Sequence, residues 1–122
     1  MSASEDLSIT VKRGDTPRFN FEVLQSDGSP FDLTGAKLIF SVKRNTDDTT
    51  YTFQRKNVAA GGDASQIEDV DLANGQFQVK LIATNTSTLT TTTFVYDVQA
   101  TIGASIITLV IDKFKVVKDV TR

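Results

Sequence analysis

The sequence of 122 residues contains no cysteine and no histidine. The first absence excludes disulfides, thiolate metal sites and cysteine nucleophiles, and the second excludes histidine-based triads and histidine general bases. No apolar run reaches the roughly 18 residues that a membrane-spanning helix needs. Carboxylates remain as candidate catalytic groups, and no pair of them has a spacing that supports acid–base catalysis. We therefore expect no enzyme, no catalytic residue, no cofactor and no small-molecule substrate.

The charge is nearly balanced, with 13 basic and 15 acidic residues. Basic pairs such as Lys12-Arg13 and Lys43-Arg44 alternate with acids, which argues against a nucleic-acid groove. Residues 1–7 (MSASEDL) are polar and acidic, the opposite of a secretory signal peptide. We expect a chain that is made in a cytoplasm and that has neither a nucleic-acid partner nor a membrane partner.

The composition favours strands, because 37 residues are Val, Ile or Thr, which fit a pleated surface better than a helix. Apolar and polar residues alternate in short runs separated by turn residues. Strands are predicted around Ile9–Val11, 18–25, Leu38–Val42, Tyr51–Phe53, Ile67–Leu72, Phe77–Leu81, Phe94–Ala100, Ile106–Ile111 and Phe114–Val117. Thr84–Thr93 is expected to form a corner with one helical turn, and residues 56–66, with Gly61-Gly62, a flexible surface loop.

Seven to nine short strands with regular turns predict an all-β fold, an antiparallel β-sandwich that occupies residues 1–122 as one domain. The apolar faces are one-sided and carry phenylalanines, which two packed sheets can interdigitate. The segment Ile106–Ile111 is the exception, since it is apolar on both faces. Such a strand either lies in the centre of a thick core or has its second face covered by a partner.

Two further patterns have a functional interpretation and a structural one. Asp69 and Asp71, with Asp63 and Glu68, could hold Ca²⁺ through oxygen ligands, but no EF-hand spacing is present and acidic loops are usually solvated, so no metal site is predicted. Tyr96 could stack on a sugar. Because it is in phase with its apolar neighbours in the strand, we expect a core ring instead.

Four segments resemble one family of tailed-bacteriophage virion proteins. They are Ile9–Thr16, Phe31–Ala36, Tyr96–Gln99 and the closing segment Phe114–Arg122. The sequence is similar, in order and spacing, to the immunoglobulin-like domain found at the N-terminus of phage baseplate upper proteins and in many small tail or neck proteins. Baseplate members continue past this domain, whereas this sequence stops at Arg122, so we expect the module to stand alone.

The resemblance implies an immunoglobulin-like sandwich that docks other phage virion proteins at the neck, tail or baseplate, in several symmetric copies. The chain would be made in the host cytoplasm and reside in the virion. Two alternatives stay open, a capsid-decorating protein and a module that binds a glycan or receptor on the host surface. Because β-sandwiches serve all these roles, fold alone does not choose among them.

The two ends of the chain are candidate docking arms. Residues 1–7 are expected to form a flexible arm, and residues 113–122 a C-terminal one. Alternation predicts that Phe114 and Val116 close the domain's own core, while Val117 faces the other way. The predicted partner interface consists of Val117, Lys118, Val120 and Arg122.

Overall fold

The structure is a computed structural model that describes residues 8–117 apart from 46, 48, 87, 88, 90 and 91. Its strands are β1 (Ile9–Lys12), β2 (Arg18–Glu22), β3 (Lys37–Lys43), β4 (Phe53–Lys56), β5 (Ile67–Asp71), β6 (Gln76–Lys80), β7 (Thr93–Ile102) and β8 (Ser105–Val117). Two short 3₁₀ helices, η1 (Val58–Ala60) and η2 (Leu72–Asn74), and one helical turn, α1 (Ala83–Thr86), connect them. The turn α1 lies in the threonine-rich segment, where a corner was predicted.

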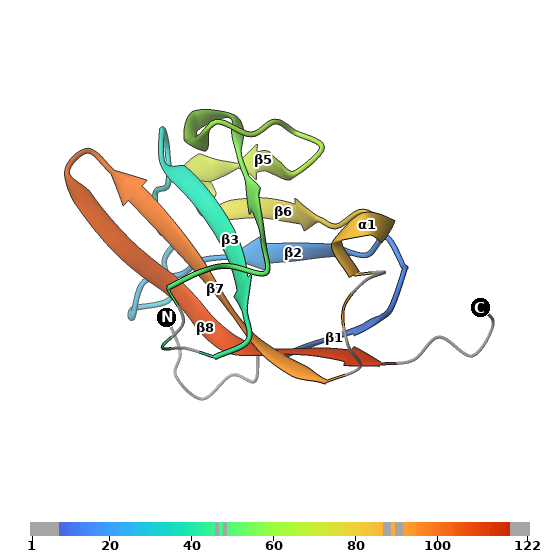
Figure 1. Cartoon of the computed structure of the whole chain (residues 1–122). Helices are drawn as coiled ribbons and strands as arrows, with labels where there is room; N and C mark the ends of the chain where they lie inside the picture. Colours follow the sequence, from blue (N-terminus) through green and yellow to red (C-terminus); the bar gives the residue numbers. More distant parts are fainter. Residues whose placement is uncertain (1–7, 46, 48, 87–88, 90–91, 118–122) are drawn as a thin grey trace.

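The strands form two packed sheets, the β-sandwich that the sequence predicts (Figure 1). One sheet has the order β1-β8-β7-β3-β4 and the other the order β2-β6-β5. In immunoglobulin terms β8, β7, β3 and β4 take the places of strands G, F, C and C′, and β2, β6 and β5 those of B, E and D. Eight strands are described, within the predicted seven to nine.

One pairing departs from the predicted antiparallel arrangement. Strand β1 runs parallel to β8, with Ile9 opposite Phe114 and Val11 opposite Val116. After β1 the chain crosses through Gly14 to Pro17 into the other sheet, so β1 is not part of a hairpin and joins the last strand instead. The remaining ladders of the described strands are antiparallel.

The core lies between the sheets and is built from the inward residues of each alternating strand. In the five-stranded sheet the rings of Phe40 and Tyr96 stack with centroids 5.3 Å apart, and Phe114 meets Phe40 edge-on at 6.3 Å. Tyr96 and Phe114 are at most 1% exposed and Val116 is 2% exposed. The predictions that Tyr96 is a core ring and that Phe114 and Val116 close the core are confirmed.

A β-bulge in β8 explains the segment that is apolar on both faces. Val98 of β7 pairs with Val110 and the next residue, Gln99, pairs with Thr108, so Leu109 is an extra residue in β8. Leu109 and Val110 are consequently both buried. Before and after the bulge, Ile106 and Ile111 point away from the core and are 70% and 62% exposed. The apolar segment is therefore divided between the core and the outer face of the sheet.

The loop after β4 is organised around a fully buried polar side chain, Asn57. Its Oδ1 accepts from Leu38 N at 3.0 Å, and its Nδ2 donates to Ala36 O and to Asp69 Oδ1, each at 3.0 Å. The side chain also caps η1 by accepting from Ala60 N. The segment that was expected to be a flexible loop is thus joined to β3 and β5 by hydrogen bonds from one residue.

A buried cation connects the two sheets. Arg55 of β4 is 8% exposed and its guanidinium donates to Lys80 O at 2.9 Å and to Ser65 O at 3.2 Å, on and beside the three-stranded sheet. Burial lowers the pKa of Arg55, an effect that Asp63 opposes. The two carbonyls accept hydrogen bonds from the guanidinium. Without them the charged group would be buried between the sheets without these partners, which costs free energy.

Candidate functional site

The outer face of the five-stranded sheet carries many lysines. Three of the four outward rows across β3, β7 and β8 show its composition. They are Lys37, Thr101 and Ile106, then Ser41, Asp97 and Ile111, and then Lys43, Val95 and Lys113. The outward residues of β4 and β1 extend the rows at both edges of the sheet. We call this surface the basic face.

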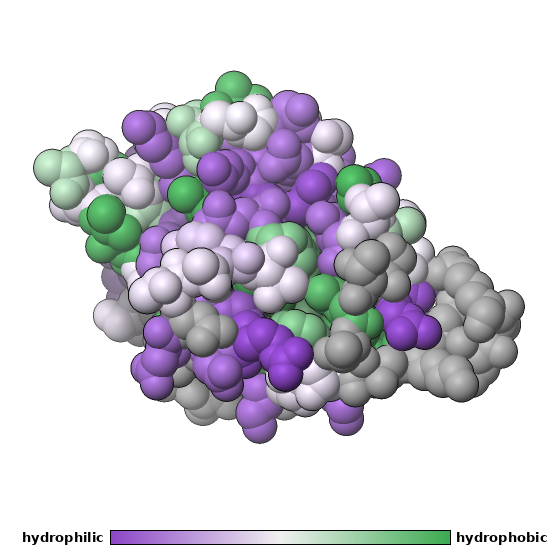
Figure 2. Space-filling model, in the orientation of Figure 1, coloured by the Kyte–Doolittle hydropathy of each residue, from purple (hydrophilic) through white to green (hydrophobic). Residues whose placement is uncertain are grey.

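Of the residues that the structure describes, six lysines and a single acidic residue, Asp97, lie on the basic face. The lysines are Lys12, Lys37, Lys43, Lys56, Lys113 and Lys115. The face therefore carries a net charge of +5 on a chain whose net charge is -2. Among the lysines lie Ile106 and Ile111, the two most exposed isoleucines of the described chain. Figure 2 shows green hydrophobic residues at the left, where the β7–β8 hairpin projects.

Asp97 is the one carboxylate of this face, and it is partly buried. Its strand neighbours are Ser41 on β3 and Ile111 on β8. Burial raises the pKa of Asp97 above its ordinary value of 3.8, and the nearby Lys43 opposes that shift. The ionised carboxylate is thus disfavoured in the native state by desolvation, despite the lysines around it.

Replacing Asp97 by Asn is expected to raise the free energy of unfolding at pH 7. The native pKa lies above the unfolded value of 3.8, so the native state gains stability as the pH falls through the native pKa. The gain in the free energy of unfolding from Asp97→Asn should therefore shrink as the pH falls towards 3.8. It should vanish at still lower pH, where the wild-type carboxyl is neutral in both states. Urea unfolding of both proteins at several pH values measures this difference in the free energy of unfolding. The exposed turn variant Asp47→Asn serves as control, with an expected change within about 0.5 kcal/mol.

The outer side of the opposite sheet carries charges of both signs. Arg18 and Lys80 lie opposite each other at one end of β2 and β6, and Glu22 and Asp71 flank Gln76 at the other end. We call the group of Glu22, Val70 and Asp71 the acidic patch. Val70 is 52% exposed. Beside it is a hollow of about 180 Å³, lined by Asn20, Phe21, Glu22, Val70, Gln76 and Phe77.

The carboxylates of the acidic patch are held by neutral donors. Gln76 Nε2 donates to Glu22 Oε2 at 3.0 Å, and Asn74 Nδ2 donates to Asp71 Oδ2 at 2.8 Å. These amides fix the direction of the carboxylates without neutralising them. The patch therefore combines negative charge with an apolar hollow.

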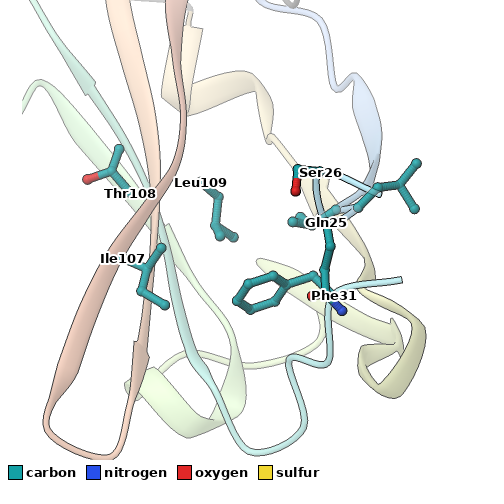
Figure 3. Close-up of a pocket in the computed structure, with 8 residues that line it drawn as sticks. Gln25, Ser26, Phe31, Ile107, Thr108 and Leu109 are labelled. Atoms are coloured by element: carbon teal, nitrogen blue, oxygen red, sulfur yellow. The ribbon is translucent and has the colours of Figure 1, made fainter. Parts of the chain in front are cut away.

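A second hollow, of about 330 Å³, opens between the end of β2 and the bulged part of β8 (Figure 3). Phe31 on one side points towards Ile107 and Leu109 on the other, and Thr108 points away from the cavity. Gln25 and Ser26 supply polar groups at its rim. It contains no titratable side chain, so it can accommodate an apolar group but offers no acid–base chemistry.

The structure separates the four acidic residues that had been considered as Ca²⁺ ligands. Asp63 accepts from Ser65, Glu68 pairs with Lys80 at 2.8 Å, and Asp69 accepts from Asn57. Within the described part of the chain no three acidic residues converge as metal ligands. Each of these carboxylates has a local role in a turn, an ion pair or the Asn57 network.

Of the predicted interface residues, Val117 is the one that the structure describes. It lies half-buried at the end of β8, opposite Lys12 and outward on the basic face. Lys118, Val120 and Arg122 lie outside the described residues, as does the N-terminal arm of residues 1–7. The basic face as a whole was not predicted, although its signal is visible in the sequence, because Lys37 and Lys43 of β3 and Lys113 and Lys115 of β8 lie an even number of positions apart within each strand.

Fold and surface together define a β-sandwich whose larger sheet has a basic outer side. No family model matches the chain, and no curated protein matches it either. No helix among the described residues is long and apolar enough to cross a membrane.

Proposed function

We propose that the chain is a non-enzymatic structural protein of a tailed-phage virion, at the neck, tail or baseplate, which docks other virion proteins in a symmetric assembly. The proposal depends on the positions of the four segments that resemble the phage virion family. Ile9–Thr16 and Phe114–Arg122 contribute to the paired strands β1 and β8, and Tyr96–Gln99 lies in β7 beside them. Phe31–Ala36 leads directly into β3 of the same sheet.

Three of these segments thus contribute to one sheet and the fourth leads into it, and the outer side of that sheet is the basic face. A rigid surface with lysines around exposed isoleucines suits recognition of another protein, since apolar anchors within a polar rim are typical of interfaces. The basic face holds one carboxylate, Asp97, and the hydroxyl of its neighbour Ser41 accepts a hydrogen bond from Gln54 Nε2 at 3.0 Å. A surface of lysines and isoleucines around one carboxylate favours binding rather than catalysis.

The direct test is the composition of the particle. Mass spectrometry of purified virions should detect this chain, and a reconstruction of the particle should contain density for the sandwich in several symmetry-related copies. A chain that is absent from purified virions would overturn the proposal. Its copy number and symmetry would distinguish a tail or neck position from the alternative, decoration of the capsid surface.

The C-terminal arm gives a second prediction. Truncation after Lys118 should leave a folded domain, because Phe114 and Val116 stay in the core and Val117 O still accepts from Arg13 N at 3.0 Å. We expect the free energy of unfolding to change by less than about 0.5 kcal/mol, while incorporation into particles falls. Thermal unfolding and a particle-assembly assay measure the two effects. If the truncated domain melts instead, the arm belongs to the core and the docking role is wrong.

The alternative of glycan binding depends on exposed aromatic rings beside a polar hollow. None of the eight phenylalanines is exposed, and the ring of the exposed Tyr51 is covered by Lys43, whose Nζ lies 4.9 Å from its centroid. Neither hollow described above contains a tyrosine. A glycan array probed with multivalent protein would favour this alternative if it gave a hit.

A further inference from the structure

The sequence contains one asparagine that is followed by glycine, Asn74, which is the last residue of η2. An asparagine side chain loses its amide when the backbone nitrogen of the next residue attacks Cγ. Glycine permits this attack most readily, because it has no side chain to crowd the ring that forms. The other four asparagines precede larger residues, namely Phe21, Thr46, Val58 and Thr86. Asn74 is therefore the most reactive asparagine of the unfolded chain.

The reaction passes through a cyclic succinimide. The nitrogen of Gly75 bonds to Cγ of Asn74, the bond from Cγ to Nδ2 breaks, and the proton of the Gly75 nitrogen reaches the departing ammonia through solvent. Water then opens the ring at either carbonyl. The product is aspartate, or isoaspartate, in which the main chain runs through Cβ, and either product adds one negative charge. Water is the only co-reactant.

The native structure blocks the first step at the attacking nitrogen. Gly75 is buried, and its N–H donates to Leu72 O at 3.0 Å. The carbonyl of Gly75 accepts from Val23 N at 2.9 Å, which joins the turn to the chain that follows β2. The exposed Asn74 side chain has a partner of its own, since Nδ2 donates to Asp71 Oδ2 at 2.8 Å. A nitrogen that is buried and hydrogen-bonded gives up its proton to solvent only after the turn opens.

We propose that Asn74 is a deamidation site that reacts only when the contact between η2 and Val23 opens, and that the reaction then makes this opening permanent. The second part follows from the space around Gly75. A Cβ on Gly75 would lie 2.5 Å from Val23 O and 2.8 Å from Phe31 O, so the segment leaves little room for a displaced backbone. Isoaspartate lengthens the main chain by one carbon immediately before Gly75. The hydrogen bonds of Gly75 to Leu72 and Val23 then cannot both form as in the native chain.

Two measurements test the proposal on one atom, because the nitrogen of Gly75 is both the protected amide and the nucleophile. Hydrogen exchange of the Gly75 N–H, followed by nuclear magnetic resonance, gives the protection factor of the turn in the native chain. Peptide mapping by mass spectrometry gives the rate at which Asn74 is converted, in the native chain and in the same chain unfolded in urea. At equal pH and temperature, conversion should be at least about a hundredfold slower in the native chain. This ratio should match the protection factor within about tenfold.

Two variants support the assignment. Asn74→Gln is the matched control, because glutamine keeps an amide but would have to close a larger ring; it should stay folded and show no conversion at this exposed position. Leu72→Ala should loosen the turn, because Leu72 packs against the core and its carbonyl accepts from both Gly75 N and Leu33 N. It should raise the native rate of conversion at least about tenfold and leave the rate of the unfolded chain unchanged. Circular dichroism checks that each variant is folded, and the two wild-type measurements decide the proposal if Leu72→Ala is not.

The converted chain carries one more negative charge, so anion exchange separates it from the starting chain. Its isoaspartate form should unfold at a lower urea concentration. The inference is overturned if the native chain converts as fast as the unfolded one, if conversion and hydrogen exchange disagree, or if a folded Leu72→Ala chain converts at the wild-type rate. An unfolded chain that converts another asparagine first, or an isoaspartate form as stable as the original, also overturns it. Because purified chain is used, none of these results bears on the proposed virion role.

Discussion

Replacing Asn57 by Ala is expected to lower the free energy of unfolding by about 2–4 kcal/mol. The amide is fully buried and joins its own loop to two other segments, since it accepts from Leu38 N and donates to Ala36 O and Asp69 Oδ1. Alanine would leave the Leu38 N–H and the Ala36 carbonyl without these partners inside the protein. Urea unfolding followed by far-ultraviolet circular dichroism measures the loss, with an unchanged m value as evidence of two-state behaviour.

The matched control is Asn20→Ala on β2. Asn20 is exposed and accepts one hydrogen bond, from Gln78 Nε2 at 2.9 Å on the neighbouring strand. Its truncation should change stability by less than about 0.5 kcal/mol, because water replaces the lost partner. Equal losses for Asn57→Ala and Asn20→Ala would mean that the buried network contributes no more than a surface pair.

Gly75→Ala is expected to lower the free energy of unfolding by at least about 3 kcal/mol. Gly75 ends η2 with φ +71°, and a Cβ there would lie 2.5 Å from Val23 O and 2.8 Å from Phe31 O. Those carbonyls belong to a hydrogen-bonded segment in which Val23 N donates to Gly75 O and Phe31 N to Val23 O. The backbone would have to shift on both sides of the new methyl group.

The variant Gly103→Ala distinguishes the cost of this steric clash from the cost of backbone strain alone. Gly103 has φ +60°, but a methyl group added to it would meet no atom within 4 Å, so its substitution should cost only about 1–2 kcal/mol. Gly75→Ala should cost at least about 2 kcal/mol more, measured by the same urea titration. Similar losses in the free energy of unfolding for the two variants would show that the backbone near Val23 shifts at little cost.

Local patterns were enough to predict most of the sandwich. Alternation identified which residues face inward along β6 and β7, and it placed Phe114 and Val116 in the core. The Asn74-Gly75 pair is typical of a tight turn, and the structure has η2 ending in a left-handed Gly75 there. These features depend on residues close together in the sequence, where periodicity and turn preferences act.

Features that depend on distant pairings were not predicted. Asn57 stands beside small residues and glycines, and its burial follows from contacts with Ala36 and Asp69 that the local sequence does not contain. The bulge at Leu109 depends on the register with β7. Likewise, the lysines of β3 and β8 become one basic face only through the order of the strands in the sheet.

The parallel pairing of β1 with β8 has a consequence for biosynthesis. Ile9 pairs with Phe114 and Lys12 with Val117, so β1 cannot find its place until β8 has been synthesised and has left the ribosome. Such long-range closure is slow, since the entropy of ordering the intervening chain must be lost before the contact forms. Until then the edge of the nascent β1 has no strand beside it, and it is a site at which neighbouring nascent chains can exchange strands.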